Sequence, residues 1–126
     1  MRKLTIRSML TLAAVAITAL ALVQFASART EPQANASATT ISVSGKEFSF
    51  KLSSKSIARP GTVRFNFKNA GHVKHDFSIN HKHTPMISPG KTASITVSFR
   101  KKGKYSYLCT VPGHAAAGMR GVFTVR

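Results

Sequence analysis

From residue 40 to the end of the chain, apolar and polar side chains mostly alternate, which is the two-residue period of strands that bury one face. In the segment TVRFNFK, residues 62–68, the valine and both phenylalanines share one face, whereas the arginine, asparagine and lysine share the other. We therefore expect the aromatic face in a core and the basic face in solvent. Seven segments of this kind are present, at residues 40–44, 47–53, 62–68, 75–80, 93–99, 104–109 and 121–126.

Turn-forming residues separate these segments. They are Gly45 with Lys46, Pro60-Gly61, Asn69-Ala70-Gly71, Pro89-Gly90 and Gly103. Short strands at such regular spacing favour a sandwich of two packed sheets. The pattern therefore predicts an all-β domain of about seven strands.

The N-terminal region has the composition of an export signal followed by a tether. Three basic residues precede an apolar run at residues 9–25, and the small residues Ala-Ser-Ala follow at 26–28, as at a signal-peptidase site. The alternative is an uncleaved membrane anchor, because the apolar run approaches the length that spans a bilayer. Small and polar residues then predict a flexible linker at 29–39. The sequence thus divides into a signal peptide at 1–28, this linker, and one domain at 40–126.

The chain is strongly basic, with 19 lysines and arginines against three acidic residues and a formal net charge of +16. Such a surface attracts acidic partner proteins or anionic membrane surfaces. Nucleic acid is the usual partner of so basic a chain, but an export signal argues against it. The charges are also scattered singly among strand residues, except at residues 100–104, where we expect a solvated hairpin end.

Cys109 is the only cysteine in the chain and cannot form an internal disulfide. Exported proteins meet an oxidising environment, so an unpaired thiol there is best explained by an intermolecular bond or by a bound metal. A domain of about 87 residues is also near the size at which a metal often supplements a small core.

The sequence around this cysteine, YLCTVPGHAAAGMRG, brings three metal-binding side chains into one loop. Cys109 ends the strand at residues 104–109, Pro112-Gly113 turns the chain before His114, and Met119 follows a second short excursion. Thiolate, imidazole and thioether together suit copper. Structural zinc would need four Cys or His donors, and an iron–sulfur cluster would need several cysteines.

A trigonal copper site needs a second histidine from elsewhere in the chain. The available residues are His72, His75, His81 and His83. His75 is the best of them, because it begins a predicted strand after the turn at Gly71. The neighbouring Asp76 can hydrogen-bond toward the Cys109 loop and hold the ligand in place.

The segment HKHTPM, residues 81–86, has two interpretations. His81 and His83 would share one face of a strand and could form a second, exposed copper-loading site with Met86. The simpler interpretation is a polar surface loop.

The segment HDF at residues 75–77, followed by YSYLCTVPGHAAAGMRG at 105–121, resembles the ligand segments of the cupredoxins, or type 1 blue copper proteins. The Cys-x4-His-x4-Met spacing is most similar to that of rusticyanin and sulfocyanin. The resemblance implies a Greek-key β-sandwich in which His75, Cys109 and His114 bind one copper ion in a plane and Met119 is the weak axial ligand.

Four protein ligands would leave no open position for a substrate, so we expect no enzyme activity. The resulting hypothesis is a periplasmic or extracellular one-electron carrier, monomeric and soluble or tethered by its N-terminus, whose redox partners have acidic docking surfaces. The alternative is a copper-binding protein for copper delivery, storage or resistance.

Overall fold

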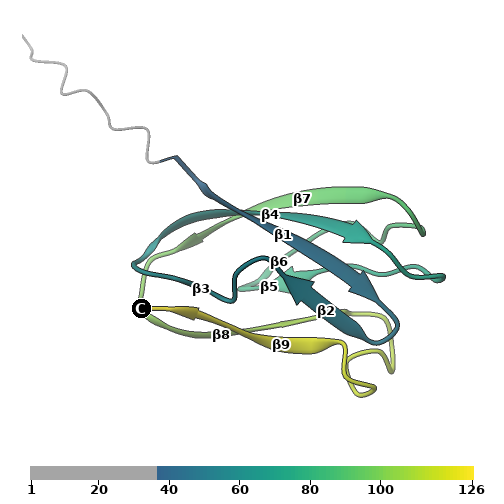
Figure 1. The fold of residues 1–126 in the computed structure, drawn as a ribbon. Coiled ribbons are helices and arrows are strands. Elements are labelled where there is room, and N and C mark those ends of the chain that lie inside the picture. Colours follow the sequence, from purple (N-terminus) through teal and green to yellow (C-terminus); the bar gives the residue numbers. More distant parts are fainter. Residues whose placement is uncertain (1–36) are drawn as a thin grey trace, which may run out of the picture. The chain divides into compact units, whose positions relative to one another are not determined.

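The alternating segments form strands that pair into two sheets, shown as two layers in Figure 1. This computed structural model describes residues 37–126. The predicted signal peptide and most of the predicted linker lie outside these residues, and Thr39, assigned to that linker, begins the first strand. Within the described residues, no helix is long and apolar enough to cross a membrane.

The first sheet has four strands in the order β2-β1-β4-β7. Their bounds are β1 (Thr39–Lys46), β2 (Ser49–Leu52), β4 (Gly61–Asn69) and β7 (Thr92–Phe99). β1 pairs in parallel with β4 and antiparallel with β2, and β4 pairs antiparallel with β7. Because β1 and β4 are parallel, the chain must leave this sheet after β2 and return to it at β4, and it passes through β3 of the other sheet on the way.

The second sheet has five strands in the order β3-β9-β8-β5-β6. Their bounds are β3 (Ser56–Ile57), β5 (Ser78–Ile79), β6 (Lys82–His83), β8 (Gly103–Leu108) and β9 (Arg120–Val125). β8 pairs antiparallel with β5 and β9, and β3 pairs in parallel with β9. The all-β sandwich is thus confirmed. The two extra strands, β3 and β6, are too short to show an alternating pattern in the sequence.

The space between the sheets is filled largely by phenylalanine rings. As expected from the pattern of residues 62–68, Val63, Phe65 and Phe67 are fully buried, whereas Arg64 and Lys68 are exposed. Phe65 lies 5.3 Å from Phe77 and 5.4 Å from Phe123, measured between ring centroids. Burying one such side chain contributes about 1.5–3 kcal/mol, so this cluster stabilises the rigid frame that carries the loops.

Three predicted boundaries were wrong, and two of them lie on either side of β7. The segment 75–80 is a strand only at β5, and His75 makes an isolated antiparallel bridge to Ile87 instead. Residues 100–102 do not close a hairpin, because β7 and β8 belong to different sheets. They cross between the layers, where the Tyr105 hydroxyl donates a hydrogen bond to the Lys101 carbonyl.

The turn expected at Gly45-Lys46 falls instead at Glu47-Phe48, and β1 continues through Lys46. Gly45 serves close packing, since a Cβ atom there would lie 2.6 Å from the Phe67 ring and 3.0 Å from the Met119 methyl group. The glycine is therefore required inside the strand. The shift by two residues brings Glu47 to the end of the sandwich where β4 and β8 also end.

Candidate metal centre

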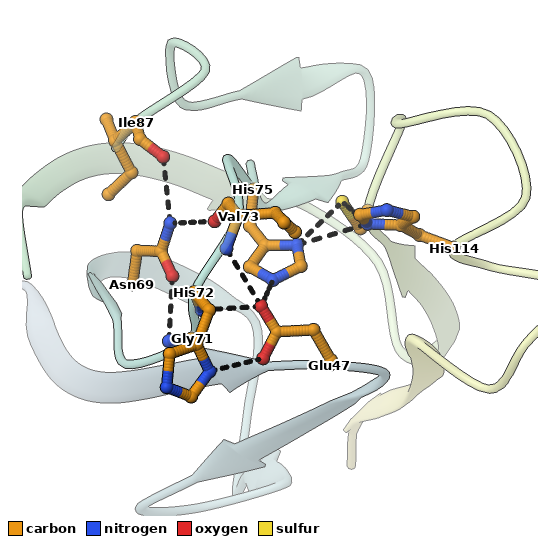
Figure 2. A network of polar contacts seen from close by, with 9 residues as sticks. Glu47, Asn69, Gly71, His72, Val73, His75, Ile87 and His114 are labelled. Atoms are coloured by element: carbon orange, nitrogen blue, oxygen red, sulfur yellow. Dashed lines mark hydrogen bonds and ion pairs between the residues drawn. The ribbon is translucent and has the colours of Figure 1, made fainter. Parts of the chain in front are cut away.

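Three side chains with metal-binding atoms meet at this end of the sandwich (Figure 2). The Cys109 Sγ lies 3.8 Å from His75 Nδ1 and 3.6 Å from His114 Nδ1, and the two Nδ1 atoms are 3.1 Å apart. His75 and Cys109 are fully buried, whereas His114 is half-buried. Among the described residues, this is the one group of three or more His, Cys and acidic side chains that could hold a metal ion.

These distances suit a single ion. Bonds of about 2.0–2.1 Å to imidazole nitrogen and about 2.3 Å to thiolate sulfur, as for zinc, place two ligand atoms of one ion about 3.5–3.8 Å apart at trigonal angles. The two sulfur–nitrogen distances match this range, and the two nitrogens are slightly closer. The donor set, with one thiolate and two imidazoles, is the one that copper favours in trigonal sites.

The loop from Cys109 to Met119 holds its own shape through backbone hydrogen bonds. The Cys109 N–H donates to the Met119 carbonyl at 3.0 Å, and the Met119 N–H donates to the His114 carbonyl at 3.0 Å. Gly113 and Gly118 have φ angles of 84° and 118°, in the range that favours glycine. Both glycines therefore permit the turns expected from the sequence, and Met119 is buried beside the cluster.

The backbone before His75 is fixed by a buried asparagine that the sequence did not single out. The Asn69 side-chain amide donates to the carbonyls of Val73 and Ile87 at 2.8 and 2.9 Å. Its carbonyl accepts a hydrogen bond from the Gly71 N–H at 2.9 Å. A fully satisfied buried amide of this kind specifies one conformation for the segment that carries the ligand.

Asp76 links this segment to the cysteine loop, as the sequence suggested. Its two carboxylate oxygens accept hydrogen bonds from the Thr110 N–H at 2.7 Å and from the Thr110 hydroxyl at 2.6 Å. Hydrogen bonds to a carboxylate are among the stronger ones in proteins. The residue after His75 is thus tied to the residue after Cys109.

Glu47 is the residue at this site that sequence reasoning missed. Its Oε1 atom accepts hydrogen bonds from the backbone N–H groups of His72 and Val73 at 2.6 and 2.9 Å and lies 3.3 Å from His75 Nε2 (Figure 2). A bond from its own backbone N–H, the bonds from His72 and Val73, and a smaller contribution from His75 lower the pKa of Glu47 to about 2. The available signal was the rarity of acidic residues in so basic a chain.

Burial raises the pKa of the Cys109 thiol above its ordinary value. The thiolate is the form that binds metals, so metal binding must release this proton. A buried thiol that resists ionisation on its own is inert toward solvent oxidants. The metal-binding state of Cys109 therefore depends on an ion that stabilises the thiolate.

The remaining histidines do not join this cluster. His72 is almost fully exposed, and its Nδ1 atom lies 3.7 Å from Glu47 Oε2. His81 has a φ of 60° in the turn between β5 and β6, so it does not share a strand face with His83. His83 is exposed, and its Nδ1 atom lies 2.9 Å from the Thr84 carbonyl oxygen. The shared strand face expected of His81 and His83 in a second copper site is therefore not formed.

A two-sheet sandwich with a buried cysteine, two histidines and a methionine at one end defines the class of type 1 copper proteins, the cupredoxins. Residues 60–126 match the family model described as copper-binding proteins of the plastocyanin/azurin family. This chain therefore belongs to that family. His75, Cys109 and His114, with Met119, form its candidate type 1 copper site. The narrower likeness of the loop to rusticyanin and sulfocyanin stays a prediction.

Similar proteins include two kinds of copper protein. The copper-resistant cuproprotein CopI of Vibrio cholerae is 33% identical, over 45% of this chain and 46% of that protein. Auracyanin-B of Chloroflexus aurantiacus is 45% identical, over 33% of this chain and 18% of that protein. The crystal structure of dithionite-reduced auracyanin from Roseiflexus castenholzii superposes with a TM-score of 0.62 at 25% identity, over 71% of this chain and 98% of that one. The chain spans less than half the length of these two curated relatives.

Proposed function

We propose that this protein is a one-electron carrier in which His75, Cys109 and His114 bind one copper ion in a plane and Met119 is the axial ligand. The observation that supports this is the convergence of Nδ1, Nδ1 and Sγ atoms within 3.8 Å of one another at a rigid end of the sandwich. Copper bound there supplies a Cu(II)/Cu(I) couple. The same four side chains would hold the metal in both oxidation states, so little rearrangement of the protein would accompany each transfer.

The surroundings of these ligands favour electron transfer over catalysis. His75, Cys109 and Met119 are buried, so water and substrates have no direct path to them. The four proposed ligands would fill the coordination positions, whereas catalytic metal sites keep one open. We therefore assign no enzyme activity to this site.

His114 is the point at which an electron would enter or leave. Its ring is half-buried and lies edge-on to the exposed Phe48 ring, with 5.1 Å between ring centroids. Ala116 and Ala117 beside it are also exposed, so the surface around the His114 ring consists of small or apolar side chains. A partner that docks here would reach the metal through one imidazole.

The charge distribution supports an acidic redox partner. The two acidic residues in the described part of the chain, Glu47 and Asp76, are both engaged in hydrogen bonds at the metal centre. The remaining charges on that part of the surface are lysines and arginines, and electrostatic complementarity raises association rates. The predicted N-terminal export signal supports a partner in the periplasm or outside the cell. In this proposal the carrier acts as a monomer, soluble or tethered.

Absorption and EPR spectra of the copper-loaded protein test the site. A type 1 centre gives an intense visible band from the thiolate–copper bond and a narrow copper hyperfine splitting. A colourless copper complex with the spectrum of an ordinary Cu(II) site would overturn the assignment. Stopped-flow reduction of an acidic cytochrome, slowed by rising salt, would then establish the carrier role.

A second candidate function is copper resistance or delivery, favoured by the similarity to CopI of Vibrio cholerae. A resistance protein would release or sequester the metal itself, whereas a carrier would retain it through many redox cycles. Incubation with a metal-free copper chelator protein distinguishes them. Transfer of copper within the time of one redox cycle would favour delivery, and retention would favour electron transfer.

A further inference from the structure

The turn between β1 and β2 contacts both histidines of the metal centre. Glu47 Oε1 lies 3.3 Å from His75 Nε2, and the Phe48 ring packs edge-on against His114. Each histidine therefore presents Nδ1 to the cluster, while Glu47 contacts the other side of His75 and Phe48 contacts the ring of His114. A single turn, far in sequence from every predicted ligand, holds part of the site.

The Glu47 carboxylate is enclosed on the side of the ligand segment. It accepts hydrogen bonds from the backbone N–H groups of His72 and Val73, and Gly71 packs directly against it. A Cβ atom at Gly71 would lie 2.6 Å from Oε1 and 2.8 Å from Oε2. The absence of a side chain at residue 71 thus makes room for the carboxylate at this position.

We propose that Glu47 is a positioning residue for His75 and lowers the reduction potential of the metal centre, an inference that rests on the proposed copper function. By accepting a hydrogen bond from Nε2–H, the carboxylate fixes the tautomer in which the Nδ1 lone pair faces Cys109 and His114. Partners of this kind orient a metal-bound histidine and increase its basicity. A negative charge beside the imidazole also favours the more positive oxidised metal.

Among the charged side chains of the described residues, Glu47 is the one placed to change the potential through a ligand histidine. The other carboxylate, Asp76, is committed to Thr110, so Glu47 is the acidic side chain that contacts a ligand imidazole. The surrounding domain is basic, which by itself raises the potential. One carboxylate at hydrogen-bond distance from His75 offsets part of that field, and its side chain is 27% exposed, so water screens it only in part.

The first test compares the copper-loaded wild-type protein with Glu47→Gln, which keeps the shape and an acceptor oxygen but removes the charge. We expect the Cu(I)/Cu(II) equilibrium to shift about tenfold toward Cu(I). This is the order of effect expected when one negative charge is removed from the far side of a ligand imidazole. For a one-electron couple, tenfold corresponds to about 59 mV. The matched control is Thr39→Lys, which makes the same change of net charge at the exposed far end of β1, about 23 Å away and largely screened.

The second test separates position from charge. Gly71→Ala pushes the carboxylate aside without altering any charge, and the backbone at residue 71 has no left-handed φ that would forbid alanine. Nitrogen-15 NMR of the Cu(I) protein should show a His75 Nε2–H proton protected from exchange in the wild type. We expect its exchange to accelerate at least tenfold in Gly71→Ala.

The outcomes are distinguishable. A blue wild-type protein whose potential does not differ from that of Glu47→Gln beyond the shift in Thr39→Lys would overturn the electrostatic role. Unchanged Nε2–H exchange in Gly71→Ala would overturn the positioning role. A wild-type protein without the thiolate–copper band would instead refute the copper function, and the NMR comparison on the metal-free protein would still decide whether Glu47 holds His75.

Discussion

The two halves of the metal centre are built differently. The Cys109–Met119 loop supplies three of the four proposed ligands from eleven consecutive residues and bonds mainly to itself. The half around His75 is assembled from separate segments: the turn at Glu47, the buried Asn69 and the bridge to Ile87. The first half is determined by local spacing, and the second by the packing of two sheets.

The halves also differ in charge. The cysteine loop carries no acidic residue, whereas both described carboxylates lie in or against the His75 half. Asp76 reaches across to Thr110 and forms a polar link between them outside the proposed ligands. The loop thus supplies three of the four proposed donor atoms, whereas the other half supplies His75 together with the two carboxylates that hold and surround it.

The largest expected effect comes from the loop. Cys109→Ser keeps a buried side chain of similar size but removes the thiolate, so we expect the visible thiolate–copper band to vanish completely. The comparison variant, Met119→Leu, should keep the band and raise the reduction potential, because an axial thioether tunes the site without defining it. Absorption spectra and voltammetry check both, and a blue Cys109→Ser protein would contradict the ligand assignment.

The link between the halves should have the next largest effect. Thr110→Val leaves one Asp76 oxygen without its hydroxyl donor, and we expect the free energy of unfolding to fall by about 1.5–3 kcal/mol. Thr62→Val is the control, since the Thr62 hydroxyl only faces Ser98 at 3.4 Å on the exposed side of a sheet. Urea unfolding of the metal-free proteins measures both. Equal losses of unfolding free energy in the two variants would contradict a stabilising role for the Asp76–Thr110 hydrogen bonds.

A substitution at a turn inside the loop should lower the free energy of unfolding somewhat less than the loss of the Thr110 hydroxyl does. Gly118 has a φ of 118°, and a Cβ there would lie 3.2 Å from the Phe48 carbonyl oxygen, so we expect Gly118→Ala to destabilise the fold by about 1–2 kcal/mol. In Gly61→Ala, the nearest atom to the new Cβ is 4.0 Å away, and its effect should stay within about 0.5 kcal/mol. Thermal unfolding compares the two, and similar melting temperatures would argue against a strained loop.

The smallest expected effect is a pH dependence of the His75 half. The pKa of Glu47 is lowered from 4.5 to about 2, so the ionised carboxylate stabilises the fold above pH 4.5, and this contribution is lost as the pH falls toward 2. The difference in melting temperature between the metal-free wild type and Glu47→Gln should be constant above pH 5 and shrink below it. A difference that stays constant down to pH 2 would contradict the hydrogen bonds assigned to Glu47.

Much of this centre was predictable from the sequence. A lone cysteine in a chain with a predicted export signal, with His114 and Met119 at five-residue intervals, indicates copper because few metals accept that donor set. Its place after a turn favours His75 among four histidines, and the structure brings it to the cluster. The copper prediction agrees with the family match, and the ligand assignment stays a prediction. Donor chemistry and short spacings could be used in this way because they are properties of the chain itself.

The turn at Glu47 was not predictable in the same way. Gly45-Lys46 has the composition of a turn, yet Gly45 lies inside β1 because the Phe67 ring and the Met119 methyl group approach it from another strand and a distant loop. A glycine required for close packing and one required for a turn look identical in a sequence. The two-residue shift that results is what brings Glu47 to His75.

The alternating pattern and the residue types alone predict the strands, the phenylalanine-rich core and the proposed donor atoms, because side-chain period and donor chemistry are local properties of the chain. The packing of the two sheets sets where β1 ends, which acidic residue meets His75, and how Asp76 joins the halves. Glu47 and His75 are 28 residues apart, and Asp76 and Thr110 are 34 apart. Contacts at such separations depend on how two sheets pack, and that is a property of the whole fold.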